Sequence, residues 1–481
     1  MHRNIHIILA CSLFFSMTLQ AVGTTGGYAI IVSKQTHADA GWKHVVDTLI
    51  KKHDAKLIVF EGDVTSALPQ LKEQFPRFTC FVAKPTEAGK QYVALVHRMT
   101  RQLDSDPYTD TTWGILTGFD AANALRIAQH SEPLTIHKVA SGTELAMEMI
   151  EEGKWYCELV QGKRVEKKPG EKAVESQGPQ DSTKALVDSL TEYKPDLFVT
   201  SGHATERDWQ IGFRYRNGYF KSKNGEIWGE DISGKKLPIV SNNPKVYLPI
   251  GNCLMGHIDG LDAMALAWMN SAGVHQMVGY TVPTWYGYAG WGCLDYFVEQ
   301  PGRYTFAEAF FVNQHAMIHR LETYFPDNAK DNLDGRDRLT RRPVPNEAAT
   351  KAKLTAQDGF GLLYDRDTVA FYGDPAWSAR MAAPKTGTLA YEQSLTEKDG
   401  VYTFTITPNR GADSFKPVNI NGAQRGYRPM VVSLPHRIKD IQILDGADLT
   451  PTIADDFILV PNPKVCDVDR AYRIVFKALK I

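Results

Sequence analysis

The sequence predicts an α/β protein with a mostly parallel sheet flanked by helices, followed by a small all-β sandwich. Three observations carry this prediction. Over most of the chain, short apolar runs alternate with amphipathic segments of helical period, as in βαβ units. Two of the apolar runs end close to a glycine, where a buried strand would leave the sheet. Beyond about residue 385, short runs of period two follow one another with turn residues between them.

The first predicted α/β unit covers residues 24–150. Its expected strands are the apolar runs at residues 28–32, 56–60, 78–83 and 113–117. Its expected helices are the amphipathic segments at residues 42–52, 64–74 and 121–129. Strands that alternate with helices in this way favour a parallel sheet.

The second predicted unit, residues 151–384, begins with a break in the pattern. Residues 161–182 are highly charged and have no apolar period, so we expect a solvated loop or linker there. The alternation then resumes, with expected helices at residues 185–192, 262–270 and 306–324 and expected strands within residues 197–202, 246–252 and 274–280. The polar stretch 327–356 is expected to be a long surface excursion.

The third predicted unit, residues 385–481, has the texture of a β-sandwich. Short runs that alternate between apolar and polar residues are separated by Pro, Asn and Gly, and no helical period lies between them. The expected strands are at residues 401–407, 430–434, 441–444, 457–460 and 472–476.

Residues 1–23 have the anatomy of a secretory signal peptide. His2 and Arg3 precede an apolar stretch over residues 5–19, and the small residues of Ala21-Val22-Gly23 suit signal peptidase. We therefore expect the mature protein to be secreted or periplasmic. No later segment has the uninterrupted apolar length of a membrane span. The formal net charge of −1 gives no field that would draw the chain to nucleic acid or anionic lipid, so neither partner is expected.

Cysteine counting points to an unpaired thiol. The sequence contains 6 cysteines, and removal of Cys11 with the signal peptide leaves an odd number, so at least one thiol is unpaired unless it bridges two chains. The cysteines have no CxxC or CxxH spacing, which argues against a structural zinc site. No cofactor is expected. An unpaired thiol at Cys253 fits this arithmetic, as does an inert buried cysteine.

Two apolar runs lead to a potential catalytic pair. The run 197–202 delivers His203, and the run 246–252 delivers Cys253. Ligands of open α/β sheets bind beyond the carboxyl ends of the strands, so a cysteine and a histidine presented there can act as nucleophile and base. The backbone N–H groups after the histidine and at the cysteine are candidates for an oxyanion hole.

A substrate-binding surface is expected from residues 284–292, which follow the strand predicted beside the nucleophile. Trp285 and Trp291 suit a pocket wall in this glycine-rich and aromatic segment, and they equally suit packing in the core or in an interdomain seam. No acidic residue can be assigned to a pocket for a basic side chain. The sequence therefore gives no substrate specificity.

These motifs resemble the caspase, legumain and gingipain superfamily of cysteine peptidases. Gly202-His203 with Trp209, and Asn252-Cys253-Leu254-Met255-Gly256 fifty residues further on, resemble the histidine and nucleophile motifs of its gingipain-like branch. Two further landmarks of that branch are resembled by residues 306–309 (Phe-Ala-Glu-Ala) and 372–375 (Tyr-Gly-Asp-Pro).

The resemblance covers roughly residues 28–385 and implies a caspase-like sheet followed by an immunoglobulin-like sandwich. It also implies an endopeptidase that acts on peptide or protein substrates through a thioester acyl-enzyme. Cys253 would be the nucleophile and His203 the general base and acid, with Ala204 and Cys253 supplying the oxyanion hole. The chain departs from the family at Ala204, where the family usually has glycine; a requirement for positive φ there would strain an alanine.

Three alternatives stay open at this stage. A metal-dependent hydrolase could use His203, His257 and Asp259, although no HExxH-type spacing supports it. A serine hydrolase lacks a GxSxG elbow in this chain. A catalytically degenerate binding or scaffold protein would keep the fold without turnover. Glu206 lies near His203 in the sequence, which does not establish that it orients the imidazole.

Overall fold

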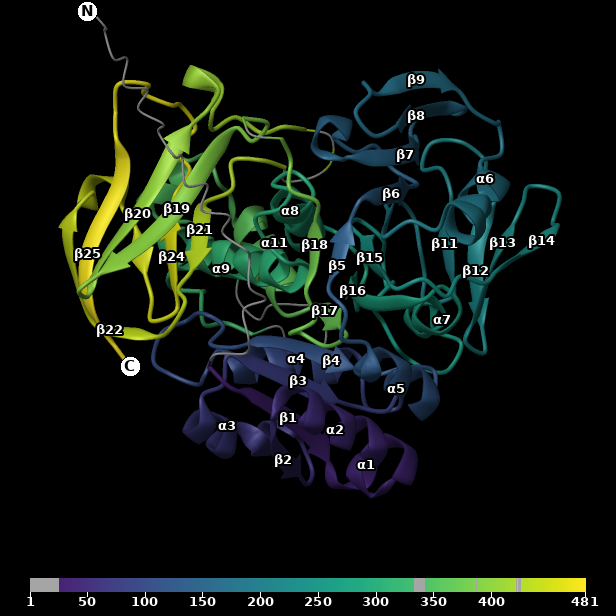
Figure 1. The fold of residues 1–481 in the computed structure, drawn as a ribbon, viewed down its shortest axis with the longest axis horizontal. Coiled ribbons are helices and arrows are strands. Elements are labelled where there is room, and N and C mark those ends of the chain that lie inside the picture. Colours follow the sequence, from purple (N-terminus) through teal and green to yellow (C-terminus); the bar gives the residue numbers. More distant parts are fainter. Residues whose placement is uncertain (1–25, 333–341, 386, 421, 423–424) are drawn as a thin grey trace, which may run out of the picture.

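A computed structural model describes residues 26–332, 342–385, 387–420, 422 and 425–481 (Figure 1). The expected signal peptide and Cys11 lie outside the described residues. The fold is α/β, with one 12-stranded, mostly parallel sheet and several smaller sheets. The strand order of the large sheet is β2-β1-β3-β4-β17-β16-β15-β10-β6-β7-β8-β9.

The first four strands form a parallel array, as the sequence predicts: β1 (Tyr28–Ser33), β2 (Lys56–Phe60), β3 (Phe78–Val82) and β4 (Thr112–Leu116). The expected helices are also present: α2 (Ala40–His53) and the 3-10 turn η1 (Val64–Ala67) with α3 (Leu68–Gln74) lie between these strands along the chain, and α5 (Ala121–Gln129) follows β4. Two further helices, α1 (Lys34–Ala38) and α4 (Lys90–Thr100), complete this part of the fold.

The centre of the sheet carries the predicted strands of the second unit. They are β10 (Leu197–Thr200), β15 (Lys245–Pro249) and β16 (Val274–Tyr280), and every residue in them is buried. This burial explains their mostly apolar sequence, because strands covered on both faces have no polar face to present; Lys245, His275 and Gln276 are buried polar exceptions. β17 (Val369–Tyr372) runs antiparallel to β16 and joins this part of the sheet to β4. The two α/β parts therefore share one sheet.

The prediction of a solvated loop or linker at residues 161–182 is wrong. This segment contains β8 (Lys163–Lys167) and β9 (Val174–Gln177), which extend the sheet from β6 (Lys138–Ser141) and β7 (Glu152–Tyr156). The charged side chains of β8 are half-exposed, and the polar strand β9 forms the edge of the sheet, where exposed polar residues discourage pairing with another chain. The polar composition of this segment suggested a loop, but strand pairing depends on backbone hydrogen bonds, which polar residues also form.

A small antiparallel sheet not predicted from the sequence lies between the two central strands along the chain. It consists of β11 (Asp208–Gln210), β12 (Tyr219–Lys223), β13 (Glu226–Glu230) and β14 (Lys236–Ile239). Helix α6 (Thr183–Asp188), which continues into the π-turn Ser189–Tyr193, and helix α7 (Met264–Ser271) contact β13. They correspond to the expected helices at 185–192 and 262–270.

Three helices pack on one another between the sheet and the C-terminal part of the chain: α8 (Tyr288–Phe297), α9 (Phe306–Tyr324) and α11 (Ala356–Arg366) (Figure 1). Only α9 is predicted from the sequence. Thr305 and Glu308 form a capping box at its start, which satisfies the first N–H groups of the helix. The short helix α10 (Glu347–Lys351) lies in the expected polar excursion, and β5 (Leu134–Ile136) pairs with β18 (Ala379–Met381).

The C-terminal β-domain contains two antiparallel sheets with a common core. One has the order β19-β20-β25-β22, made of Tyr391–Lys398, Val401–Pro408, Tyr472–Lys480 and Ile438–Asp445. The other has the order β21-β24-β23, made of Met430–Ser433, Phe457–Val460 and Thr452–Ile453. The alternation in β20 is the predicted one, because Tyr402, Phe404 and Ile406 are buried while the residues between them are half-exposed.

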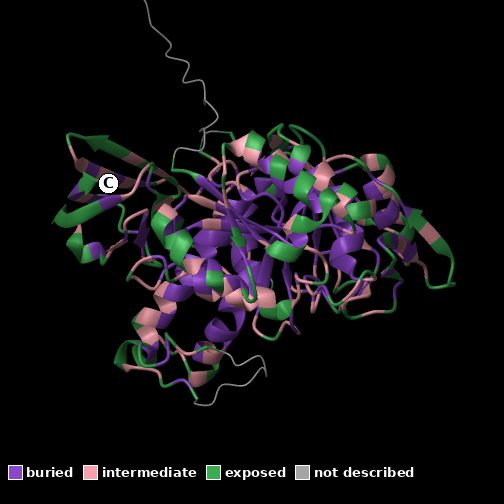
Figure 2. Cartoon of the chain, turned by 90° about the horizontal axis from the view of Figure 1, so that it is seen from below, coloured by how far each residue is buried: buried purple, intermediate pink, exposed green. Residues whose placement is uncertain are grey.

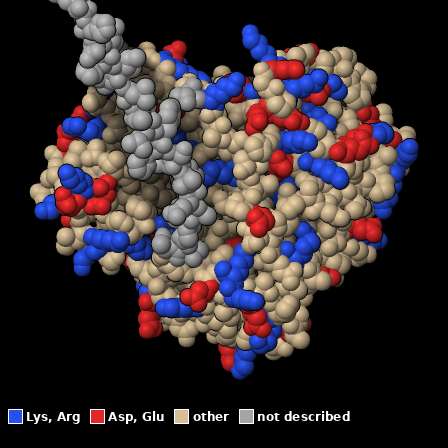
Figure 3. All heavy atoms as spheres, viewed as in Figure 1, with Lys and Arg blue, Asp and Glu red and all other residues tan. Residues whose placement is uncertain are grey.

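The buried residues gather at the centre of the molecule, and exposed residues mark the outer strands (Figure 2). On the face shown in Figure 3, basic and acidic side chains are interspersed, in keeping with the formal net charge of −1. None of the described helices is long and apolar enough to cross a bilayer.

Candidate active site

The two predicted catalytic segments leave the same edge of the sheet. β10 and β15 are parallel neighbours, with Thr200 opposite Pro249. His203 follows the first strand and Cys253 follows the second. Because the carboxyl ends of parallel strands share an edge, this register places the two segments side by side. The expectation that these strands are neighbours is confirmed.

Asn252 joins the two segments directly. Its fully buried side chain accepts a hydrogen bond from the Thr200 hydroxyl (2.7 Å) and donates one to the Gly202 carbonyl oxygen (3.1 Å). The residue before the cysteine is thus bonded to the residue before the histidine. Thr200 is in turn bonded to the Tyr247 hydroxyl (2.9 Å). This buried network fixes how the two loops leave the sheet.

The turn after Cys253 is held on the end of β16. The Leu254 N–H donates to the Val282 carbonyl (3.1 Å), and the Gly256 N–H donates to the Tyr280 carbonyl (2.9 Å). Leu254 has φ +58°, a left-handed conformation that is uncommon for a residue other than glycine. Such local strain persists only where the surroundings determine it, and it is frequent at functional sites.

Cys253 is the one described cysteine that is not buried. All five described cysteines are free thiols, and Cys80, Cys157, Cys293 and Cys466 are buried. The Cys253 Sγ accepts a hydrogen bond from the Thr284 N–H at 3.2 Å. This contact brings a partial positive charge to the sulfur and connects it to the segment expected to bind substrate.

His203 is exposed, and its imidazole stacks on the Phe213 ring with 4.7 Å between centroids. The Gln210 N–H donates to the His203 carbonyl oxygen (2.9 Å), which fixes the backbone. Within the described part of the chain, no carboxylate hydrogen-bonds to the imidazole. Glu206 instead pairs with His257 (3.1 Å), so the question of whether it orients His203 is answered in the negative.

Ala204 does not adopt a positive φ. The left-handed conformation falls one residue before the histidine, at Gly202 with φ +101°. The concern that alanine would be strained in the position of the family's glycine therefore does not apply. Over the described residues, neither the Ala204 N–H nor the Cys253 N–H donates a hydrogen bond, so both remain available to an incoming oxygen.

A cavity of about 340 Å³ lies beside the cysteine. Ser201, Gly202 and Gly251 line it from the two catalytic segments, and Thr284 lines it from the segment that bonds the sulfur. The remaining lining residues are Glu158, Leu159, Phe213, Trp285, Tyr286, Gly287, Trp291 and Gly422. The segments that carry His203 and Cys253 thus border a cavity with aromatic walls, although neither of these two side chains is among its lining residues.

The two tryptophans selected from the sequence have different environments. Both line the cavity, but Trp285 is 72% exposed whereas Trp291 is 8% exposed. Trp291 lies on α8 against Gly422 of the C-terminal β-domain. The expectations of a pocket wall and of an interdomain seam both hold for this residue.

Sequence reasoning missed Glu158, the only charged residue among those that line the cavity. Its carboxylate accepts hydrogen bonds from the Thr143 hydroxyl (2.5 Å) and the Glu144 N–H (3.3 Å). Burial raises the pKa of Glu158 above its usual range. The residue follows β7, more than forty positions before His203, and no local pattern marks it.

A larger cavity lies elsewhere, at the carboxyl ends of β1 and β2. It has a volume of about 890 Å³, and Ser33, Phe60 and Glu87 are among its lining residues. Neither this cavity nor the one of about 340 Å³ has a cysteine or a histidine among its lining residues. Only the smaller one is lined by Gly202, which directly precedes His203, and by Thr284, whose N–H bonds the Cys253 sulfur. Size alone therefore does not locate the chemistry, and the smaller cavity beside Cys253 is the better candidate.

The three side chains considered as zinc ligands have other partners. His257 pairs with Glu206, Asp259 pairs with Arg207 (2.7 Å), and His203 stacks on Phe213. They do not form a metal-binding group within the described residues. The metal-hydrolase alternative gains no support from this geometry.

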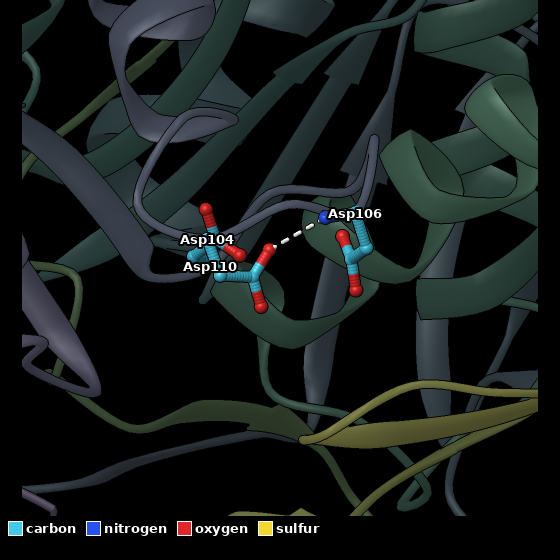
Figure 4. A group of neighbouring side chains, drawn as sticks. All are labelled: Asp104, Asp106 and Asp110. Atoms are coloured by element: carbon cyan, nitrogen blue, oxygen red, sulfur yellow. Dashed lines mark hydrogen bonds between the residues drawn. The ribbon is translucent and has the colours of Figure 1, made fainter.

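One group of carboxylates elsewhere in the described chain could hold a metal ion. Asp104, Asp106 and Asp110 place carboxylate oxygens within 4.8 Å of one another (Figure 4). Asp104 accepts a hydrogen bond from the Asp106 N–H (2.8 Å), and Asp110 accepts one from the Leu103 N–H (2.8 Å). Burial and the neighbouring carboxylates raise the pKa of Asp110 to about 9. These residues contribute nothing to the Cys253 cavity.

No protein-family model matches this chain, and no curated protein matches it.

Proposed function

We propose that the protein is an exported, gingipain-like cysteine endopeptidase. One observation carries the proposal: neighbouring parallel strands present His203 and Cys253 at one edge of the sheet, beside a cavity. The bond from Thr284 to the Cys253 sulfur adds to it, since it joins the nucleophile to the cavity wall. The resemblance of the flanking motifs supports the same family, with a caspase-like sheet and an immunoglobulin-like C-terminal domain.

In the proposed reaction, His203 takes the thiol proton of Cys253, and the sulfur attacks the carbonyl carbon of the scissile peptide bond. The N–H groups of Ala204 and Cys253 stabilise the oxyanion. His203 then gives the proton to the leaving amine, and the acyl group remains on sulfur as a thioester. Water, deprotonated by His203, attacks the thioester and releases the carboxylic acid and the free thiol.

The cavity is proposed to take a side chain of the substrate next to the scissile bond. Aromatic rings attract cations through their faces, and a carboxylate adds to that attraction. The combination of Glu158 with Trp285, Tyr286 and Phe213 favours a basic side chain in this cavity. We propose lysine or arginine at this position of the peptide.

Export is proposed from the sequence of residues 1–23. N-terminal sequencing of the protein recovered outside the cytoplasm should begin near residue 24. Recovery of the uncleaved chain from the cytoplasm alone would refute export and would leave the peptidase proposal untouched.

The decisive experiment for activity is turnover of a mixed peptide library by the wild type and by Cys253→Ala and His203→Ala. We expect cleavage by the wild type only, unaffected by a metal chelator. Iodoacetamide should modify Cys253 before the four buried cysteines, and His203→Ala should slow that reaction. Peptide binding without cleavage by the wild type would favour a degenerate binding protein, and loss of cleavage on chelation would favour a metal enzyme.

A further inference from the structure

The C-terminal β-domain reaches the cavity beside Cys253. Gly422 lines that cavity together with Trp285 and Trp291. Its φ is +105°, and a Cβ at this position would lie 2.6 Å from the Trp291 ring. The backbone of the C-terminal domain therefore lies against the tryptophan at a distance that leaves no room for a side chain.

Buried ion pairs anchor the residues that follow. Arg425 Nε lies 2.6 Å from an Asp295 oxygen, and a second Arg425 nitrogen pairs with Glu299. Arg428 Nε lies 2.8 Å from the other Asp295 oxygen, which also accepts a hydrogen bond from the Gly426 N–H (2.8 Å). The Asp295 and Arg425 side chains are 4% and 2% exposed. Two carboxylates are thus balanced by two guanidinium groups with almost no solvent contact.

The same arginine connects this anchor to the cavity. The Arg425 guanidinium lies 5.1 Å from the centroid of the Trp291 ring. Trp291 and Asp295 are one helical turn apart on α8, and α8 begins directly after the cavity-lining residues 284–287. One side chain therefore contacts both the wall of the cavity and the acidic end of the helix that carries it.

We propose that the C-terminal β-domain sets the width of the substrate cavity: Gly422 forms part of its wall, and residues 425–428, which lie outside the cavity, hold Trp291 in place. This inference rests on the proposed peptidase function for its consequence, which is that the C-terminal domain selects which substrate side chain fits. Burial and the Asp295 carboxylate raise the pKa of Glu299, whereas the Arg425 guanidinium lowers it, so without Arg425 this part of α8 would hold carboxyl groups that are costly to bury. The positive charge of Arg425 keeps α8 and its tryptophan in place.

A matched pair of variants tests the proposal. Arg425→Met removes the guanidinium beside Trp291. Arg437→Met is the control, because Arg437 also belongs to the C-terminal domain, lies over an aromatic ring (Phe75, 3.6 Å) and pairs with an aspartate (Asp455), yet lies outside the cavity. Hydrogen exchange of residues 284–294 is measured in both full-length variants. We expect exchange there to rise about tenfold or more in Arg425→Met and to stay at the wild-type rate in Arg437→Met.

Peptide hydrolysis by the same variants tests whether the C-terminal domain affects substrate selection. Arg425→Met should change the ratio of kcat/KM between large and small side chains at the cavity position by about tenfold, the scale of a modest pocket change. Equal exchange in residues 284–294 of the wild type and Arg425→Met would overturn the proposal. Absence of peptide cleavage by the wild type would refute the proposed function instead, while the exchange result would still decide whether these residues hold the wall.

Gly422→Ala covers the case in which Arg425→Met does not fold. The added methyl group meets Trp291, so the preference should move towards smaller side chains, again by about tenfold. Gly387→Ala is its control, since that glycine also has a positive φ (+80°) in the C-terminal part but has open space around it. The same profile from both alanine variants would overturn the proposal.

Discussion

Asn252→Ala should separate the two catalytic segments while leaving Cys253 and His203 intact. In the wild type, this buried amide bonds the Thr200 hydroxyl on one side and the Gly202 carbonyl on the other. Alanine removes both bonds. Thr200 keeps its contact with Tyr247, but the carbonyl of the buried residue Gly202, immediately before His203, loses its partner.

The expected magnitudes follow from these contacts. A buried carbonyl left without a hydrogen bond costs about 1–3 kcal/mol, so the free energy of unfolding should fall by about 2 kcal/mol. The effect on catalysis should be larger than this structural cost. A displacement of about 1 Å between reacting groups costs about a hundredfold in rate, so kcat/KM should fall about a hundredfold. Asn252→Asp can still accept from Thr200 but cannot donate to Gly202, and it should lose activity similarly.

Asn217→Ala is the matched control. Asn217 is also buried and also uses both ends of its amide, donating to the Ser182 hydroxyl and accepting from the Gly218 N–H, but it lies outside the cavity. Peptide hydrolysis and chemical denaturation should be measured on both variants. The reasoning is refuted if both lose similar stability and Asn252→Ala keeps activity within twofold of Asn217→Ala.

Three further predictions concern charge. Glu158→Gln should lower kcat/KM for substrates with lysine or arginine by about 10- to 100-fold, as expected for one partly screened charge, and should leave apolar substrates nearly unchanged. Asp374→Asn should destabilise the protein by about 3 kcal/mol at pH 7, because Asp374 is buried and pairs with Lys52 (3.0 Å) and His53 (2.8 Å). These partners hold the pKa of Asp374 well below its usual range, so the stabilisation is present above the unfolded pKa of about 3.9 and is lost as pH falls below it. Asp110→Asn, in contrast to Asp374→Asn, should stabilise the protein. It should raise the melting temperature at pH 8 but not at pH 4. The folded pKa of Asp110 is raised to about 9, and ionisation therefore favours the unfolded chain as pH rises from about 3.9 towards 9.

Each of these predictions has a control and a contrary outcome. Equal losses for basic and apolar substrates would show that Glu158 supports the structure rather than binding a cation. Asp47→Asn, which removes an exposed helical ion pair with Lys43, should cost less than about 1 kcal/mol at any pH; an equal cost for Asp374→Asn would contradict the buried-cluster argument. The melting temperature of Asp110→Asn is measured with a chelator present, and a value below that of the wild type at pH 8 would contradict the expected stabilisation.

The sequence was informative wherever an element is defined by its own residues. The run 28–32 is a strand because five consecutive apolar residues need burial on both faces, and this pattern is visible locally. The run 274–280 is predicted from its apolar residues although it also contains the buried polar residues His275 and Gln276. β17 could not be found in this way. Its four residues join the sheet only because β4 and β16 lie on either side, and those partners are far away in the sequence.

Helix α8 was missed for a different reason. Gly290 and Gly292 lower its helix propensity, and the segment therefore suggested a pocket rather than a helix. In the structure the glycines permit close packing, since a Cβ on Gly292 would lie 1.9 Å from the Asn313 side chain on α9. Tertiary packing overrides propensity here. The cavity wall supplied by Glu158 and Gly422 escaped notice because both are distant in sequence from the catalytic pair.

The dependence on glycine around the histidine can be tested directly. Gly202 has φ +101°, whereas Ala204, in the position where the family has glycine, does not have a positive φ. Gly202→Ala should therefore strain the loop that carries His203, at a cost of about 1–3 kcal/mol in the free energy of unfolding. The loss in kcat/KM, expressed as a free energy, should be larger than this cost. Ala204→Gly keeps the N–H and relieves no strain, so activity should stay within about twofold, with any loss coming from added backbone freedom. A large gain in activity in Ala204→Gly would contradict this reasoning and would show that the alanine does obstruct the oxyanion site.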